Sequence, residues 1–203
     1  MKTRIFFLAL AIVCAGLAQA QSGNYILRED FSSNTNGWLQ EKTDKYNFTV
    51  AAGKYYCHSS GGNWFSTIPV NMTGVEDFEL SFKLRKIGGT DGFYFGVRAG
   101  LDTKTGYYHL VGITGNGDFV LANKGAYPSD IIRSEKNDFV RRGNSENKIV
   151  LRRQNGYFTL FINGTKAGVV KAEKLYGSNF GVELWSGNEV LDITLDDLTI
   201  TKL

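Results

Sequence analysis

The alternation of apolar and polar residues with a period of two is the feature that most constrains what this chain folds into. It recurs in segment after segment from residue 21 onward, and nothing longer than a turn or two has the period of a helix. In EDFELSFKLRK one parity holds the apolar residues Phe78, Leu80, Phe82 and Leu84. In GFYFGVRAG one parity holds Phe93, Phe95, Val97 and Ala99. Because alternate residues of a strand point to opposite faces, each segment is predicted to be a strand with one face in a core and the other in water.

Turn residues separate these segments at intervals typical of antiparallel hairpins. In NGYFTLFINGTKAGVV, Asn163 and Gly164 accept the positive φ angles that a two-residue hairpin turn requires. One charged and irregular segment, residues 125–144, breaks the rhythm, and we expect it to cross from one sheet to the other, with room for a short helical turn. The pattern predicts an all-β fold, a two-sheet antiparallel β-sandwich, as a single domain over residues 21–203.

The first twenty residues predict an exported protein. MKTRIFFLALAIVCAGLAQA has basic residues at its start, a short apolar run and small residues at Ala18 and Ala20, as in a secretory signal peptide cleaved before Gln21. Val13 disfavours lipidation at Cys14, because the processing enzyme prefers a small residue there. No segment has the roughly 20 apolar residues of a transmembrane helix. We therefore expect a secreted, periplasmic or extracellular location.

Charge and cysteine content argue against a nucleic-acid-binding protein and against a disulfide-stabilised one. Removal of residues 1–20 takes away two of the 23 basic residues and none of the 20 acidic ones, which leaves a formal charge of +1 and no indication of nucleic-acid binding. Cys57 is then the one remaining cysteine, so no internal disulfide forms. We predict that Cys57 is a buried small apolar residue. The sequence gives no oligomeric state.

Three consecutive segments carry a family resemblance. They are GYYHLVGITGNGDFVLANKG, NKIVLRRQNGYFTLFINGTKAG and NFGVELWSGNEVLDITLDDLTIT. In order and spacing they resemble the second half of the bacterial concanavalin A-like (laminin G-like) jelly-roll domains, and EDFSSNTNGWLQ is similar to the first strand and turn of those domains. The resemblance covers most of residues 27–202. It implies a sandwich with one curved sheet, whose concave face binds glycans in many relatives and carries catalysis in some, and it implies that Trp38 packs into the core near the termini.

The catalytic motifs of the enzymes in that superfamily are missing from the sequence. Laminarinase-type hydrolases carry E-x-D-x-x-E or E-x-D-x-x-x-E on one strand, because a retaining pair of carboxylates lies about 5 Å apart. This chain has no such run, and it also lacks the R-x-E-L and Q-x-H strands of jelly-roll lyases. An enzyme is therefore not favoured, although a hydrolase that uses an unfamiliar pair such as Glu79 and Glu183 stays open.

No cofactor is predicted. His58 and His109 lie 51 residues apart without a partner at metal-ligand spacing. The change of parity near Asp196 and Asp197 predicts a β-bulge, whose carboxylates either bond to the backbone or hold a structural calcium ion.

The predicted solvent-facing parity supplies a candidate binding surface. With the apolar parity in the core, the opposite face of the expected curved sheet presents Glu79 and Lys83 together with the candidate ligand-binding set Tyr94, Arg98, Tyr107, His109, Glu183 and Trp185. Sugars offer C–H faces to aromatic rings and hydroxyls to carboxylates and guanidinium groups. Gly96 leaves space for a ligand to approach the sheet, and Tyr56 and Trp64 are candidates to extend the surface at its rim.

The leading hypothesis is an exported, non-catalytic β-sandwich that binds a glycan or a cell-surface partner on the concave face of one sheet. Its alternatives are the hydrolase described above and a structural or interaction domain with no small ligand. The fold alone does not choose among the three.

Overall fold

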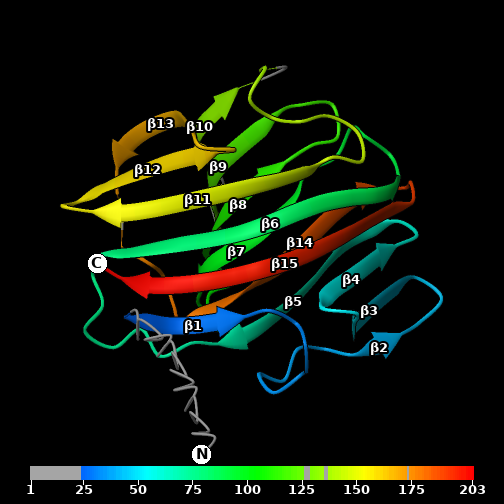
Figure 1. Cartoon of the computed structure of the whole chain (residues 1–203), viewed down its shortest axis with the longest axis horizontal. Coiled ribbons are helices and arrows are strands. Elements are labelled where there is room, and N and C mark those ends of the chain that lie inside the picture. Colours follow the sequence, from blue (N-terminus) through cyan, green and yellow to red (C-terminus); the bar gives the residue numbers. More distant parts are fainter. Residues whose placement is uncertain (1–23, 126–128, 135–136, 173) are drawn as a thin grey trace, which may run out of the picture.

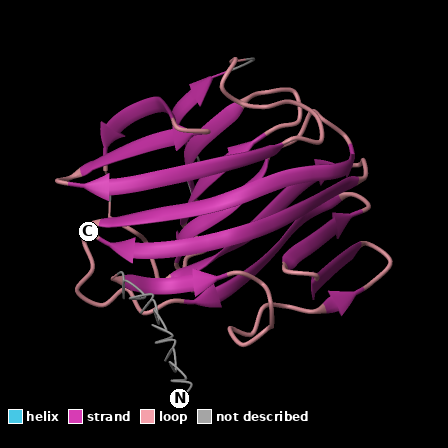
Figure 2. Cartoon of the chain, viewed as in Figure 1, coloured by secondary structure: helices cyan, strands magenta, loops and turns pink. Residues whose placement is uncertain are grey.

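The computed structural model describes residues 24–125, 129–134, 137–172 and 174–203, and every regular element among them is a strand (Figure 2). The predicted signal peptide and Cys14 lie outside these residues. Among the described residues, none forms a helix with the length and hydropathy needed to cross a bilayer.

The strands form two antiparallel sheets that pack face to face (Figure 1). The first sheet has nine strands, and β1 lies outside its linear order because it pairs only with β15. In the order of the sheet, its other strands are β13 (Thr165–Lys171), β12 (Tyr157–Ile162), β11 (Glu146–Gln154), β6 (Phe78–Gly89), β15 (Leu191–Lys202), β4 (Lys54–Ser59), β3 (Tyr46–Ala51) and β2 (Glu41–Lys42). The strand β1 spans Tyr25–Glu29, so the two ends of the described chain meet in one ladder.

The second sheet has six strands. Their order is β10 (Ser129–Ser134), β9 (Phe119–Lys124), β8 (Tyr108–Ile113), β7 (Phe95–Leu101), β14 (Asn179–Gly187) and β5 (Gly62–Pro69). The predicted two-sheet antiparallel sandwich is confirmed.

The apolar parity of the strands fills the space between the sheets. In β6, Phe78, Leu80, Phe82 and Leu84 are fully buried. They join one core cluster with residues of the second sheet such as Val97, Phe180 and Val182. Cys57 is buried in the same cluster, as predicted. Removal of this apolar surface from water, at about 25 cal/mol per Å², is what holds the two sheets together.

Trp38 closes the core beside the paired termini, as the resemblance implied. Its ring packs on Phe31 and Tyr55 with centroids 5.4 and 5.1 Å away. Its indole N–H donates to the buried carboxylate of Glu29 at 2.8 Å. The Glu29 carboxylate also accepts the backbone N–H of Phe31, so it links the first strand to the turn that follows it.

Of the two predictions about irregular segments, the one for residues 125–144 is wrong and the one for the bulge is confirmed. The described part of residues 125–144 contains the strand β10, which pairs with β9, and so the expectation of a plain crossing with a helical turn is wrong for these residues. The crossing to the nine-stranded sheet comes after β10. The bulge predicted in β15 is present, with a register shift between Asp196 and Thr199 and a φ angle of 47° at Asp197.

Candidate functional site

Two adjacent glycines lie in the middle of the outer face of the six-stranded sheet. The ladders align one residue from each of five neighbouring strands in a row: Phe65, Glu183, Gly96, Gly112 and Val120. The two glycines occupy the middle of the row and carry no side chains. A Cβ atom at residue 96 would lie 2.1 Å from the carbonyl oxygen of Val111, so only glycine fits there without a shift of the backbone.

A cavity of about 400 Å³ lies on this face. Its walls are formed by Tyr94, Tyr108, Leu110, Val120, Glu183 and Trp185, and Asn63 and Lys124 complete the lining. The volume is at the small end of the range of about 300–1,000 Å³ that is typical of ligand sites.

Glu183 is the one carboxylate among the described lining residues, and it is held by two donors. Arg98 Nε donates to Glu183 Oε2 at 3.0 Å, and the Tyr108 hydroxyl donates to Oε1 at 3.1 Å. Burial and the charge of Glu183 raise the pKa of Tyr108, so its hydroxyl keeps the proton that it donates. The pair fixes the carboxylate at the cavity wall, where its remaining lone pairs accept hydrogen bonds.

The guanidinium group of Arg98 is enclosed by aromatic rings. Its central carbon lies 3.6 Å from the ring centroid of Phe65 and 4.3 Å from that of Tyr108. Its side chain is 8% exposed and that of Glu183 is 6% exposed. The ion pair is therefore buried although it lies on the outer face of the sheet, and Arg98 acts by positioning Glu183.

Two large aromatic residues on this face are half exposed. Trp185 is 49% exposed and Phe65 is 46% exposed. The ring of Trp185 packs against Phe93 with centroids 5.6 Å apart, which limits its rotation while one side stays open to solvent. A supported ring beside a fixed carboxylate offers both of the contacts that a sugar ring requires.

The structure brings together four of the six predicted ligand-binding residues. Tyr94, Glu183 and Trp185 line the cavity, and Arg98 holds the Glu183 carboxylate by a hydrogen bond without lining the cavity itself. The predicted position of His109 on the same face is wrong. His109 is fully buried on the core side of β8, with its ring 5.2 Å from that of Phe158.

Tyr107, the sixth predicted residue, precedes β8 and is half buried. Its ring packs edge-on against Tyr176, with centroids 5.6 Å apart, and it is not part of the cavity lining that the structure describes. The residues of this strand that do line the cavity are Tyr108 and Leu110, and the candidate set did not include Tyr108. Sequence parity missed it because both faces of β8 are buried, so apolar residues do not mark the core side.

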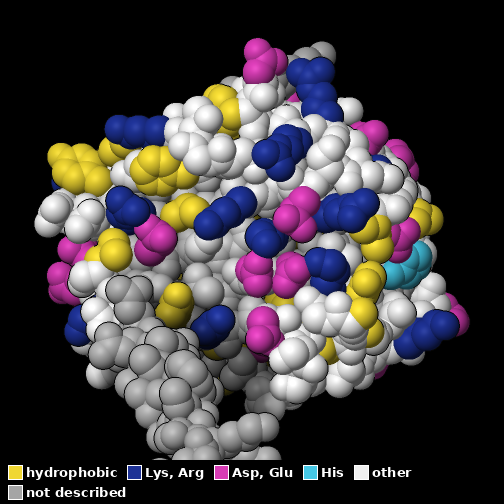
Figure 3. All heavy atoms as spheres, in the orientation of Figure 1, with side chains coloured by type: hydrophobic (Ala, Val, Ile, Leu, Met, Phe, Trp, Pro, Cys, Tyr) yellow, Lys and Arg dark blue, Asp and Glu magenta, His cyan; other side chains and the backbone are white. Residues whose placement is uncertain are grey.

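Glu79 and Lys83 lie on the outer face of the other sheet, contrary to the prediction. Both are in β6, where Glu79 pairs with Arg152 at 2.6 Å and Lys83 pairs with Asp197 at 2.6 Å. Figure 3 shows this face, on which acidic and basic side chains are intermixed. The hydrophobic core separates Glu79 from Glu183, so these two carboxylates do not form the pair that the hydrolase alternative needs.

The bulge and the predicted rim residues also belong to other parts of the molecule. At the bulge, the backbone N–H of Asp197 donates to the Asp196 carboxylate at 2.8 Å, and Asp196 also pairs with Lys54. Among the described residues, no group of three or more His, Cys, Asp or Glu side chains is placed to hold a metal ion. Tyr56 lies in β4 of the nine-stranded sheet, and Trp64 packs on Tyr46 with centroids 4.4 Å apart. These aromatic residues do not extend the cavity.

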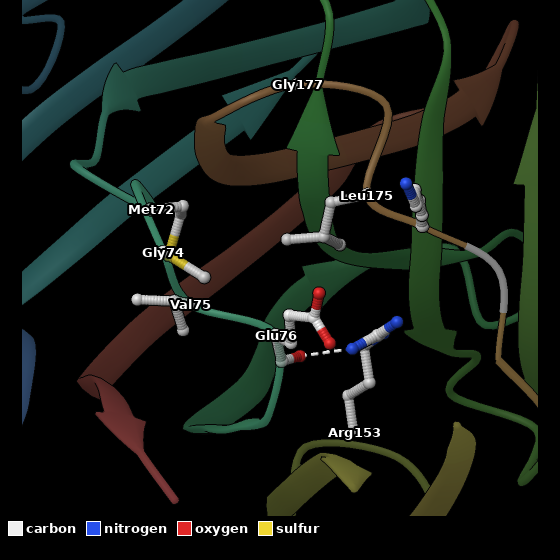
Figure 4. Close-up of a pocket in the computed structure, with 8 residues that line it drawn as sticks. Met72, Gly74, Val75, Glu76, Arg153, Leu175 and Gly177 are labelled. Atoms are coloured by element: carbon white, nitrogen blue, oxygen red, sulfur yellow. Dashed lines mark hydrogen bonds between the residues drawn. The ribbon is translucent and has the colours of Figure 1, made fainter. Parts of the chain in front are cut away.

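A second cavity of about 320 Å³ lies between the connections that precede β6 and β14 (Figure 4). Met72, Val75 and Leu175 form its apolar side. Arg153 of β11 points into it but donates to the backbone carbonyl of Glu76, so the guanidinium links β11 to the connection that precedes β6. No aromatic ring is present in the lining that the structure describes, which makes this cavity the weaker candidate for a sugar.

Comparison with known proteins identifies the fold. No family model matches the sequence, and no curated protein does. Among solved structures, the carbohydrate binding module CBM66 from Bacillus subtilis is 14% identical with a TM-score of 0.62, over 83% of this chain and 98% of that one. The catalytic domain of a laminarinase from Thermotoga petrophila is 7% identical with a TM-score of 0.58, over 89% of this chain and 98% of that one.

The chain has the concanavalin A-like jelly-roll fold. This confirms the fold that the sequence resemblance implied. The same fold is present in the binding domain of botulinum neurotoxin DC in complex with SialylT, at 15% identity and a TM-score of 0.58. That match covers 89% of this chain but only 48% of the longer neurotoxin chain. At these identities the jelly-roll likeness establishes architecture, and function is argued from the cavity.

Proposed function

We propose that this protein is an exported, non-catalytic glycan-binding domain, and that the glycan binds in the cavity on the outer face of the six-stranded sheet. The observation that carries the proposal is the placement of the half-exposed Trp185 ring beside the fixed Glu183 carboxylate. The ring would stack on the C–H face of a sugar, and the carboxylate would accept its hydroxyls. A carbohydrate-binding module among the solved structures of similar fold supports the same use of this jelly roll.

The absence of catalysis is part of the proposal and rests on the number of carboxylates. Glycoside hydrolysis generally needs two carboxyl groups about 5–9.5 Å apart. In the described lining Glu183 stands alone, without a second carboxyl group. Export is proposed from residues 1–20 of the sequence, and N-terminal sequencing of the protein recovered outside the cytoplasm tests it: we expect Gln21 as the first residue.

The experiment is a glycan array followed by titration of the best ligand into two variants. Trp185→Ala is expected to weaken binding at least about tenfold, because a buried ligand–aromatic contact contributes about 1.5 kcal/mol or more. Tyr157→Ala is the matched control, since Tyr157 is an aromatic residue of similar exposure, 53%, in β12 of the other sheet. We expect it to bind like the wild type. Retention of no glycan, or equal losses in both variants, would refute the proposed function.

A further inference from the structure

The cavity lining is polar at Glu183 and apolar at Leu110 and Val120, and Lys124 lies farther along the strand of Val120. Glu183 stands on β14 at one side, and Val120 stands on β9 at the other, with β7 and β8 between them. Three strand spacings of about 4.8 Å separate their backbones by roughly 14 Å. The cavity of about 400 Å³ has room for one sugar unit with one edge toward each side.

The apolar side has a core of its own. Leu110 and Val120 line the cavity, are 5% and 2% exposed, and belong to a cluster with Tyr108 and Ala122 that is separate from the main core. The ring of Tyr94 packs against this cluster. The backbone groups of β8 and β9 at this level are paired in their ladder. The side chains of Leu110 and Val120 offer neither a donor nor an acceptor to a ligand.

This division discriminates between substituents on a sugar. A hydroxyl placed against Leu110 and Val120 would lose its water without gaining a partner, which is unfavourable. A methyl group in the same place would be removed from water and would fill the space. Glu183, on the other side, remains available for the ring hydroxyls.

We infer that the preferred ligand is a sugar that carries a methyl group, with the methyl seated against Leu110 and Val120 and the ring hydroxyls directed to Glu183. This inference rests on the proposed function. The methyl group has two chemical sources, the C-methyl of a 6-deoxy sugar and the acetyl methyl of an N-acetylated sugar.

The test compares pairs of sugars, one with and one without a substituent that carries a methyl group. The 6-deoxy pairs are L-fucose with L-galactose and L-rhamnose with L-mannose, and the N-acetyl pairs are N-acetylglucosamine with glucose and N-acetylgalactosamine with galactose. Each sugar is titrated into the whole protein and followed by ligand-observed NMR. In at least one pair we expect the methyl-bearing sugar to bind roughly tenfold more tightly, with its methyl protons receiving the strongest saturation transfer. The pair that responds identifies the source of the methyl.

A conservative variant tests the seat of the methyl group. Val120→Thr exchanges a methyl for a hydroxyl at similar volume, and it is expected to bring the ratio of affinities within the responding pair toward one. Val169→Thr is the matched control on β13 of the other sheet, where Val169 is 43% exposed, and the ratio should be unchanged. Thermal melting of both variants verifies that they are folded.

The outcomes separate this inference from the proposed function. Equal binding within every pair, together with tight binding of another glycan on the array, overturns the methyl preference and leaves the glycan-binding function intact. Binding of none of these sugars and of no arrayed glycan overturns both. A ratio in Val120→Thr that equals the wild-type ratio also overturns the inference, because the methyl would then be seated elsewhere.

Discussion

At the scale of single residues, Arg98 acts as a structural support for the site. Its guanidinium lies between the rings of Phe65 and Tyr108 and holds Glu183 at the cavity wall. A buried ion pair is not by itself a source of stability, because both charges lose their water. Removal of one partner is strongly unfavourable, however, since the other charge is then left buried alone.

Arg98→Ala is therefore expected to destabilise the folded protein. We expect the free energy of unfolding to fall by about 3–5 kcal/mol, because the Glu183 carboxylate would remain buried without its partner. The matched control is Arg152→Ala, which removes the partner of Glu79 on the solvent-facing side of β6 and should change the free energy by about 0–1 kcal/mol. Urea denaturation measures both. Similar losses for the two variants would show that the Arg98 pair is as weakly coupled to folding as a surface pair.

Among the strands of the six-stranded sheet, glycines allow neighbouring backbones to approach closely. Gly96 on β7 faces Gly112 on β8, and Gly181 on β14 pairs with Arg98 on β7. A Cβ atom at residue 181 would lie 1.9 Å from the carbonyl oxygen of Ser66. At these positions a neighbouring backbone approaches so closely that a side chain would not fit.

Substitution of Gly96 tests how closely β7 and β8 approach each other. Gly96→Ala places a Cβ atom 2.1 Å from the Val111 carbonyl oxygen, so the β7–β8 ladder must shift, and we expect a loss of about 1–3 kcal/mol in the free energy of unfolding. Gly92→Ala is the control, since its nearest neighbour is the Thr90 hydroxyl oxygen at 3.9 Å. Thermal or urea unfolding compares the two. A stable Gly96→Ala protein would mean that the ladder has more room than the structure indicates.

The same strands show how far sequence patterns predict a fold. In β6 one face is apolar and the other charged, and the parity of the sequence predicted every buried residue of the strand up to Leu84. In β8 both faces are buried, so parity carried no information, and His109 was placed on the wrong face. The sheet to which a strand belongs is a long-range property. Parity therefore predicted that Glu79 and Glu183 both point away from the core, but it did not show that they lie in different sheets.

At the scale of the whole molecule, the sandwich buries several groups in their neutral forms. Burial raises the pKa of the Cys57 thiol well above its usual value near 9. Burial also raises the pKa values of the hydroxyls of Tyr55 and Tyr108 above the usual value near 10. In the unfolded chain these groups ionise at their usual values, so at alkaline pH the unfolded state loses protons that the folded state retains.

These groups therefore stabilise the folded protein less as the pH rises. The contribution of these groups is fully present below about pH 9 and decreases as the pH rises, by up to about 1.4 kcal/mol per pH unit for each group that has ionised in the unfolded chain. Urea denaturation at pH 7–11 is expected to show a declining free energy of unfolding above pH 9. Tyr108→Phe should show a shallower decline than the wild type. A free energy that is constant up to pH 11 would contradict the assignment of these groups to the interior.

A glycan bound beside Trp185 would change the indole N–H signal of that residue, and the signals of the three tryptophans are separately observable. The indole of Trp38 is bonded to Glu29 in the core, and that of Trp64 is bonded to the carbonyl of Gly61. In a two-dimensional ¹H–¹⁵N spectrum, with signals assigned by single Trp→Phe variants, saturation with the array-selected glycan is predicted to shift the Trp185 signal and leave that of Trp38 unchanged. A Trp185 signal that stays in place while the glycan is bound would contradict the account.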